Sequence, residues 1–154
     1  MVTLSLKHKI KQGVDLLKNG GVVVFPTDTL YALGADAYSS HAVRRVFKIK
    51  SRGLSTPLPL FLSSTEEMKT VSIKIPTVAD DLADRFWPGP LTLVLRKSPL
   101  VPDLVTGGRP TVAVRVPENP VALALLEAMD TPITGTSANI SGSPDLFFIE
   151  EVQE

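Results

Sequence analysis

Four short segments of this 154-residue chain carry polar side chains two or four residues apart. A lysine and an arginine together suit a phosphate chain, since arginine offers a planar fork of donors and lysine offers a point charge. A further arginine could clamp a small carboxylate. The residue types therefore indicate a site for a phosphorylated ligand beside a carboxylate. The four pairs are Thr27 with Thr29, Lys50 with Arg52, Thr111 with Arg115, and Ser137 with Asn139.

No strong nucleophile accompanies these segments. The chain has no cysteine, and its two histidines, His8 and His41, fall on predicted helices away from the polar pairs. The sequence contains neither a Walker-type phosphate loop nor a glycine-rich dinucleotide fingerprint. This composition favours chemistry that depends on positioning and on neutralising charge more than on a protein nucleophile.

Each pair taken alone also has an ordinary structural explanation. Lys-x-Arg is typical of a solvated helix end, Ser-x-Asn of a turn, and Thr-x-Thr of a strand. Their shared position, at or just beyond the ends of predicted strands and helices, favours function, because open α/β sheets bind ligands at strand ends. We therefore predict that Thr27, Asp28 and Thr29 form the polar lip of a pocket after a buried strand.

Alternating helices and strands must position these side chains. Helices that alternate with strands imply an α/β open sheet, partly parallel, with helices packed on its faces. Pro57 and Pro59 place their strand near a sheet edge, because proline cannot donate to the ladder. Strands are predicted at 22–25, 57–62, 91–95, 111–116 and within 132–142, and helices around 10–17, from 39 or 40, from 64, from 77, over 121–129 and after Pro144.

Length and charge bound the possible functions. The 154 residues predict a single domain, 1–154, with one core. Sixteen basic and 16 acidic residues cancel, so any nucleic-acid contact would depend on a local patch. The absence of cysteine excludes disulfides and thiolate metal sites. No apolar run approaches the length of a membrane span, and we expect a cytoplasmic protein with no membrane partner.

Five segments follow one another in the order and spacing of the YrdC-like family of threonylcarbamoyl-AMP synthases. They are FPTDTLYALGADA, KIKSR with TPLPLFL, WPGPLTLVL, TVAVRVP and PITGTSANISG, and the resemblance covers roughly 20–142. It implies a twisted open sheet of mixed parallel and antiparallel strands with a concave basic groove. It also implies that L-threonine, bicarbonate and ATP give threonylcarbamoyl-adenylate and pyrophosphate. Partner proteins would then transfer the threonylcarbamoyl group to adenosine 37 of tRNA.

The resemblance implies roles for the nucleotide-binding residues. Lys50 and Arg52 match the family's Lys-x-Arg motif and would hold the ATP phosphates and act in catalysis. Ser137 and Asn139 match its Ser-x-Asn motif and would hold the adenylate, with Thr111 also on the nucleotide. As charges at the end of a helix, Lys50 and Arg52 are expected to be exposed and to contribute little to stability.

The resemblance also implies an amino-acid site. Thr27, Thr29 and Arg115 would bind threonine, with Arg115 on its carboxylate. The threonine amine would attack carbon dioxide or bicarbonate, so that the substrate supplies the nucleophile. A Mg²⁺ ion would help to offset charge on the leaving pyrophosphate. Asp28 or Asp36 could contact this ion, although either residue could equally belong to a surface turn.

Ser137 and Asn139 are expected to project into the same crevice as Lys50. Ile133 and Ile140 would then pack into the core on the other side. A structure tests this arrangement directly.

The chain departs from the family pattern at three places. Many relatives have glycine where this chain has Ala32, and a polar residue, often histidine, where it has Phe61. Relatives also continue with further strands, whereas this sequence stops at Glu154. We therefore expect a domain that lacks the family's last strands, and an apolar patch that a homodimer could bury. This patch would lie near Phe147, Phe148 and Ile149.

A run of basic residues allows two further interpretations. As a groove for double-stranded RNA or tRNA, it would make the chain a binding module or a ribosome-maturation factor, with steep salt dependence and no turnover. Alternatively, the run is an ordinary solvated helix face. The run comprises Arg44, Arg45, Lys48, Lys50 and Arg52.

Overall fold

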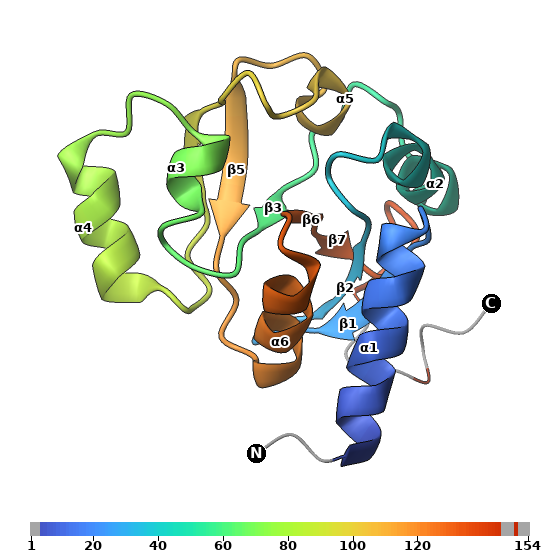
Figure 1. The fold of residues 1–154 in the computed structure, drawn as a ribbon. Helices are drawn as coiled ribbons and strands as arrows, with labels where there is room; N and C mark the ends of the chain where they lie inside the picture. Colours follow the sequence, from blue (N-terminus) through green and yellow to red (C-terminus); the bar gives the residue numbers. More distant parts are fainter. Residues whose placement is uncertain (1–3, 146–149, 151–154) are drawn as a thin grey trace.

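The computed structural model describes residues 4–145 and residue 150. Helices and strands alternate through this part of the chain (Figure 1). The helices are α1 (Leu4–Lys18), α2 (Ser40–Lys50), α3 (Met68–Val71), α4 (Thr77–Phe86), α5 (Asp103–Thr106) and α6 (Pro120–Met129). The strands are β1 (Val23–Pro26), β2 (Tyr31–Gly34), β3 (Leu60–Phe61), β4 (Leu93–Arg96), β5 (Thr111–Arg115), β6 (Ile133–Thr134) and β7 (Thr136–Ser137).

The strands form two sheets. One has the order β1-β2-β7 and is antiparallel throughout. The other has the order β4-β5-β3-β6, in which β3 and β5 are parallel and the other pairs are antiparallel. The predicted α/β class with mixed parallel and antiparallel strands is therefore confirmed, with its strands divided between two sheets. Gly135 alone separates β6 from β7, so one short segment passes from the second sheet to the first.

β3 is an interior strand, and the prediction of an edge strand is wrong. It pairs with β5 on one side and with β6 on the other. The two prolines precede the paired residues Leu60 and Phe61, and Pro59 contributes only its carbonyl, which accepts a hydrogen bond from the Gly135 amide at 2.8 Å. Proline is tolerated at this position because the contact requires an acceptor and not an amide donor.

Two groups of buried apolar side chains form the core. The larger group joins the four-stranded sheet to α2, α3 and α4. The smaller group lies between the three-stranded sheet and the helices α1 and α6, which pack side by side. Figure 1 shows α3 and α4 on the opposite side of the molecule from α1 and α2.

Side-chain caps begin two of the helices. The Ser39 side chain accepts a hydrogen bond from the Ala42 amide at 3.3 Å, at the start of α2. The Asn119 side chain accepts from the Val121 and Ala122 amides at the start of α6. These side chains satisfy amides that have no partner inside the helix.

Two segments, Ser64–Glu67 and Thr77–Asp80, have the sequence of a capping box, in which a Ser or Thr precedes an acidic residue by three positions and begins a helix. Thr77 is the first residue of α4, and the cap is Pro76, which has no side-chain hydrogen bond. Near α3, the Glu67 carboxylate accepts hydrogen bonds from the Ser63 amide and hydroxyl, one residue before the predicted partner Ser64. Both helices exist, but the capping interactions that the sequence indicated do not form as predicted.

Two features predicted from the sequence fall on residues that the structure does not describe. They are the helix predicted after Pro144 and the apolar patch at Phe147, Phe148 and Ile149. Within the described part of the chain, no helix is long and apolar enough to cross a membrane.

Candidate functional site

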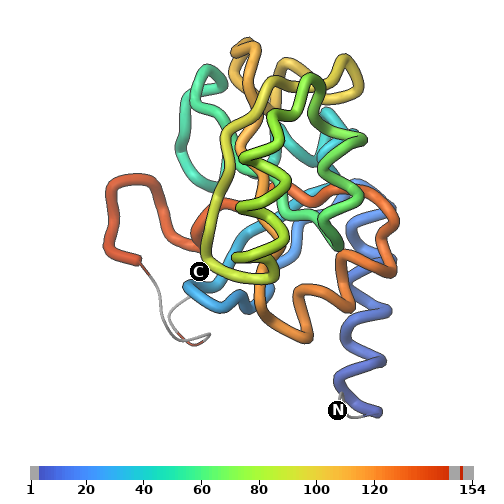
Figure 2. Tube along the Cα trace, turned by 90° about the vertical axis from the view of Figure 1, so that its left-hand side faces the viewer, coloured from blue at the N-terminus to red at the C-terminus, as the bar shows by residue number. Residues whose placement is uncertain are grey.

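A pocket of about 410 Å³ lies between the end of α2 and the loop that follows β7. We call it the Lys50 pocket. Figure 2 shows the loop after β7 projecting from the body of the molecule, on the same side as the loop after α2. Lining residues come from both segments, and nearly all are polar or charged. They are Lys50, Ser51, Arg52, Gly53, Thr56, Thr136, Ser137, Asn139, Ser141 and Gly142.

The end of α2 turns two cations into this pocket. Ser51 adopts the left-handed conformation (φ 51°), and its amide donates to the Lys48 carbonyl. The Arg52 amide donates to the Phe47 carbonyl at 3.0 Å, which closes the helix end. This reversal of the chain places the side chains of Lys50 and Arg52 on the same pocket.

Lys50 is only 3% exposed, so the expectation of an exposed helix-end charge is wrong for this residue. Its ammonium donates to the Ser137 carbonyl at 2.5 Å and to the Asn139 side-chain oxygen at 2.8 Å. The end of β7 and the loop after it cover the lysine. Sequence spacing could not show this, because the covering residues lie nearly 90 positions further along the chain.

All the hydrogen-bond acceptors around Lys50 are uncharged. Among the described residues, no carboxylate lies within ion-pair distance of Lys50 or Arg52. Burial is the main cause that lowers the pKa of Lys50 from its ordinary 10.5; Arg52 lowers it further, and Asp145 raises it. The pocket therefore holds a buried ammonium beside a guanidinium with no carboxylate of the described residues in direct contact. Asp145, which accepts a hydrogen bond from the Asn139 amide at 3.5 Å, offsets only part of this charge. Such an arrangement attracts an anion.

Asn139 fixes both the pocket and the loop that rims it. Its side-chain oxygen accepts from the Ser137 hydroxyl at 2.5 Å, and its amide donates to the Ser143 carbonyl at 2.7 Å. The predicted convergence of Ser137 and Asn139 on Lys50 is confirmed. Ile133 is fully buried as expected, but Ile140 is 55% exposed, so that prediction is wrong.

A second group of polar residues surrounds Arg115, at the end of β5. We call it the Arg115 cluster: Arg115, Asp28, Thr29, Phe61 and the carbonyl of Gly89. The guanidinium donates through Nε to the Gly89 carbonyl at 2.9 Å and through Nη1 to the Thr29 hydroxyl at 3.2 Å. Nη2 forms an ion pair with Asp28 at 2.6 Å, but this contact is not aligned as a hydrogen bond. Arg115 is thus held from three directions in a largely buried position.

Thr27 and Thr29 differ in what their hydroxyls do. The Thr27 hydroxyl accepts from the Thr29 and Leu30 amides at 3.1 Å each and donates to the Leu30 carbonyl at 2.6 Å. It thereby builds the turn between β1 and β2. The Thr29 hydroxyl, in contrast, faces Arg115. Thr27 therefore positions Thr29 by holding the turn that carries it.

Asp28 bridges two segments of the chain. Its Oδ1 accepts from the Glu118 amide at 3.0 Å and pairs with Arg115, and its side chain is 14% exposed. Asp36 is separate from this cluster and accepts from the Tyr38 amide at 3.0 Å. The part of the chain that the structure describes contains no group of three or more metal-ligating side chains. The sequence offered no signal for the Asp28–Arg115 pair, since the two residues are far apart along the chain.

Thr111 lies apart from the Lys50 pocket. It begins β5, pairs with Arg96 and is not among the described residues that line the pocket. Sequence reasoning also missed Thr136, whose hydroxyl accepts from Arg52 Nη1 at 3.3 Å. The signal for Thr136 was present, because it directly precedes Ser137 in the same run of small polar residues.

The geometry can now be compared with known proteins. The model of the Sua5/YciO/YrdC family, described as telomere recombination, matches residues 15–154. The chain belongs to this family. The predicted resemblance is therefore confirmed.

Relatives in this family include two threonylcarbamoyl-AMP synthases. The protein of Pyrococcus abyssi is 48% identical over 136 residues, and that of Bacillus subtilis is 41% identical over 140 residues. Each match covers 88% of this chain and 40% of the relative. A crystal structure of P. abyssi Sua5 complexed with L-threonine has a TM-score of 0.92 at 45% identity, covering 95% of this chain and 43% of that one. The chain thus spans about two fifths of these relatives.

The two internal departures from the family pattern are both buried. Ala32 pairs with Ser137 across β2 and β7, and its methyl group packs in the smaller group of core residues. Phe61 packs in the same group, with its ring against the guanidinium of Arg115. The extra methyl at 32 is therefore accommodated by packing, whereas Phe61 belongs to the Arg115 cluster.

Proposed function

We propose that this chain carries the substrate site of a threonylcarbamoyl-AMP synthase. The reaction forms L-threonylcarbamoyladenylate and pyrophosphate from L-threonine, bicarbonate and ATP. The observation that carries the proposal is the Lys50 pocket, in which a buried ammonium and a guanidinium face hydroxyls and an amide with no carboxylate in ion-pair range. A nucleoside triphosphate supplies the missing negative charge.

In this proposal the triphosphate binds between Lys50 and Arg52. The ammonium acts as a point charge and the guanidinium as a fork on the phosphate oxygens. Ser137 and Asn139 contact the adenylate. Thr111, which does not line the Lys50 pocket, would contact a part of the nucleotide that extends beyond it. Mg²⁺ enters with the ATP phosphates as part of the substrate, and Asp28 remains the candidate protein contact for it. In that role the Asp28 carboxylate would contact the ion while it remains paired with Arg115.

Threonine binds beside the Arg115 cluster. Its carboxylate meets Arg115 and the Thr29 hydroxyl, while Thr27 holds the turn that carries Thr29. The crystal structure of the P. abyssi relative with L-threonine supports an amino-acid site in this fold. Because Asp28 already neutralises Arg115, the cluster as a whole suits a zwitterion better than a polyanion.

The chemistry requires no nucleophile from the protein. The threonine amine attacks the carbon of bicarbonate, a C–N bond forms, and water leaves to give a carbamate. A carbamate oxygen then attacks the α-phosphorus, and the bond to the bridging oxygen breaks to release pyrophosphate. Lys50 and Arg52 stabilise the charge that develops on the leaving group. Transfer of the threonylcarbamoyl group to adenosine 37 of tRNA would follow on partner proteins.

Release of pyrophosphate tests the proposal. We expect release from ATP only when L-threonine and bicarbonate are both present, with L-threonylcarbamoyladenylate as the second product by mass spectrometry. Release that does not depend on threonine, or no release at any substrate concentration, would contradict it.

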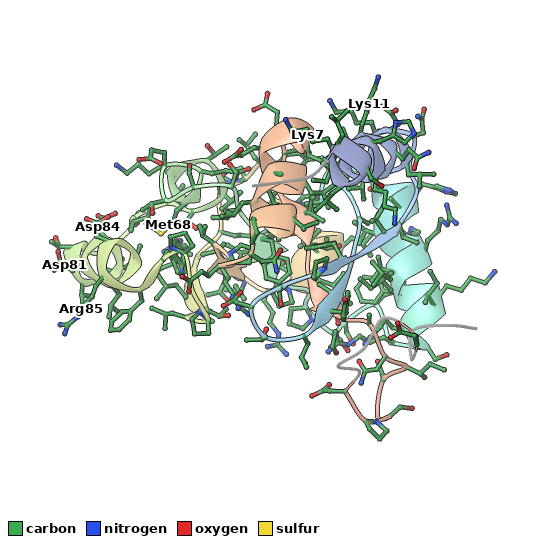
Figure 3. The ribbon with its side chains drawn as sticks, turned by 90° about the horizontal axis from the view of Figure 1, so that it is seen from below. Lys7, Lys11, Met68, Asp81, Asp84 and Arg85 are labelled. Carbon is green, nitrogen blue, oxygen red and sulfur yellow. The ribbon has the colours of Figure 1, made fainter. Side chains whose placement is uncertain are left out.

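A second candidate function rests on the basic surface. Arg44, Arg45 and Lys48 are exposed along α2, and Lys7 and Lys11 lie on the outer surface of α1 (Figure 3). Double-stranded RNA or tRNA could bind there through its phosphates. This function predicts an affinity that falls steeply with salt concentration and no consumption of ATP. A filter-binding salt series beside the pyrophosphate assay separates the two functions.

A further inference from the structure

Phe61 links the two parts of the candidate site. It pairs with Arg115 across the parallel strands β3 and β5, so both side chains point to the same face. The guanidinium carbon lies 5.8 Å from the centre of the Phe61 ring, which is within the range of a cation–π contact. Phe61 is 6% exposed, so water screens this contact little.

The Phe61 ring also lies against the segment that leads into the Lys50 pocket. A Cβ atom at Gly135 would lie 2.3 Å from Cε2 of Phe61, so the backbone passes directly against the ring. Thr136 and Ser137, the next two residues, line the Lys50 pocket. The ring therefore contacts both Arg115 and the backbone that leads into the neighbouring pocket.

A second aromatic ring offers a comparison. Phe25 and Phe61 form an edge-to-face pair, with ring centres 5.9 Å apart at 74°. Phe25 is also buried in the smaller group of core residues. The two phenylalanines thus share their packing environment, and Phe61 is the one whose ring lies against the Arg115 guanidinium.

We propose that Phe61 is a positioning residue for the amino-acid site. Its ring holds the guanidinium of Arg115 in the orientation that reaches Thr29 and Gly89, at a fixed place relative to the Lys50 pocket. A flat aromatic face restrains a planar guanidinium and favours its positive charge, which an aliphatic side chain cannot do. This inference rests on the proposed function for its consequence in catalysis.

The matched variants Phe61→Leu and Phe25→Leu test the proposal. Each removes one ring of the edge-to-face pair, so both should lower the melting temperature by a similar amount. Phe61→Leu should raise the KM for L-threonine about 5- to 30-fold, with kcat and the KM for ATP within about twofold of the wild type. Phe25→Leu should leave the KM for threonine within about twofold.

A direct measurement on Arg115 separates this inference from the proposed function. Its Nε–H donates to the Gly89 carbonyl, so its ¹⁵N-resolved NMR signal should exchange slowly with water. Phe61→Leu should speed that exchange about tenfold or more, and Phe25→Leu should not. Unchanged exchange in Phe61→Leu, or an equal rise of the threonine KM in both variants, would overturn the inference. A wild-type chain that binds no threonine would instead overturn the proposed function.

Discussion

The Lys50 pocket and the Arg115 cluster each hold a buried cation, but the two cations are treated differently. Lys50 donates to a carbonyl and an amide oxygen, and Asn139 presents no charge. Arg115 donates to a carbonyl and a hydroxyl but also forms an ion pair with Asp28. The first site is left positive, whereas the second is neutral overall.

This difference follows the charges of the proposed ligands. Burying a charge without a partner costs stability, so an uncompensated lysine indicates a site whose partner arrives from outside. A triphosphate is such a partner, while a zwitterionic amino acid brings as much positive charge as negative. Charge compensation, more than the identity of the cation, therefore distinguishes the two halves of the site.

Removing the uncompensated charge should have the largest effect. Lys50→Met keeps the length and apolar stem of the side chain but removes the ammonium. We expect ATP binding to weaken by about 2 to 4 kcal/mol, or about 30- to 1000-fold, since hydrogen bonds between charged groups are lost. Isothermal titration calorimetry with ATP measures the change.

Lys48→Met is the matched control for this variant. Lys48 is an exposed lysine on the same helix, two residues before Lys50. Its loss should change the affinity for ATP by less than about threefold, as is usual for an exposed charge. Equal losses in the two variants would indicate that a diffuse positive surface binds ATP, and not the Lys50 pocket.

Asp28→Asn tests the Arg115 cluster, because it removes the carboxylate that compensates the charge of Arg115. The amide keeps an acceptor for the Glu118 amide but leaves the buried Arg115 without a counter-charge. We expect the free energy of unfolding to fall by about 2 to 3 kcal/mol, measured by chemical denaturation. Sulfate should now restore part of the lost stability, because the cluster has become positive like the Lys50 pocket.

The second ion pair of the described chain provides the control. Asp103 pairs with Lys97, but its side chain is 79% exposed. Asp103→Asn should therefore lower the free energy of unfolding by less than about 1 kcal/mol. A loss in Asp28→Asn no larger than this would show that burial adds nothing to the Arg115 pair.

Asn139→Asp makes the reverse change and supplies compensation to Lys50. The new carboxylate would occupy the position of the amide oxygen, 2.8 Å from the ammonium. We expect the affinity for ATP to fall about 10- to 30-fold, because a fixed charge now competes with the phosphates. Gln12→Glu, on the exposed face of α1, adds the same charge outside the pocket and should leave the affinity unchanged. An unchanged affinity in Asn139→Asp would contradict the role of uncompensated charge.

The sequence predicted the members of the Lys50 pocket better than their environment. Motifs at 50–52 and 137–139 identified the side chains, because local spacing and residue type carry that information. That Lys50 is buried could not be foreseen, since the covering segment comes from a distant part of the chain. The same limit applies to β3, where the prolines correctly excluded amide donors but could not reveal that Gly135, directly after β6, supplies the donor. It also applies to Asp28, because its partner Arg115 lies on β5 in the other sheet, 87 positions further along the chain.

The smallest expected effect is that of pH, because raising the pH deprotonates Lys50 in only a fraction of the molecules. Burial lowers the pKa of Lys50 below 10.5, so the folded chain releases this proton at a lower pH than the unfolded chain. Between these two pKa values the unfolded state binds more protons, and the contribution of Lys50 to the free energy of unfolding therefore rises with pH. The cost of burying the charge is fully present below the folded pKa and disappears as the pH approaches 10.5.

The affinity for ATP should move in the opposite direction over the same pH window, because the phosphates need the protonated amine. The affinity for ATP should fall by at most about tenfold per pH unit above the pKa of Lys50, whereas the free energy of unfolding should rise. Lys50→Arg keeps its charge throughout this range, so the variant should lose both trends. Calorimetric titrations with ATP and urea denaturation, each at several alkaline pH values, compare the wild type with this variant. If affinity and stability fall together in the wild type and in Lys50→Arg alike, another group is titrating, and the uncompensated charge of Lys50 does not control ATP binding.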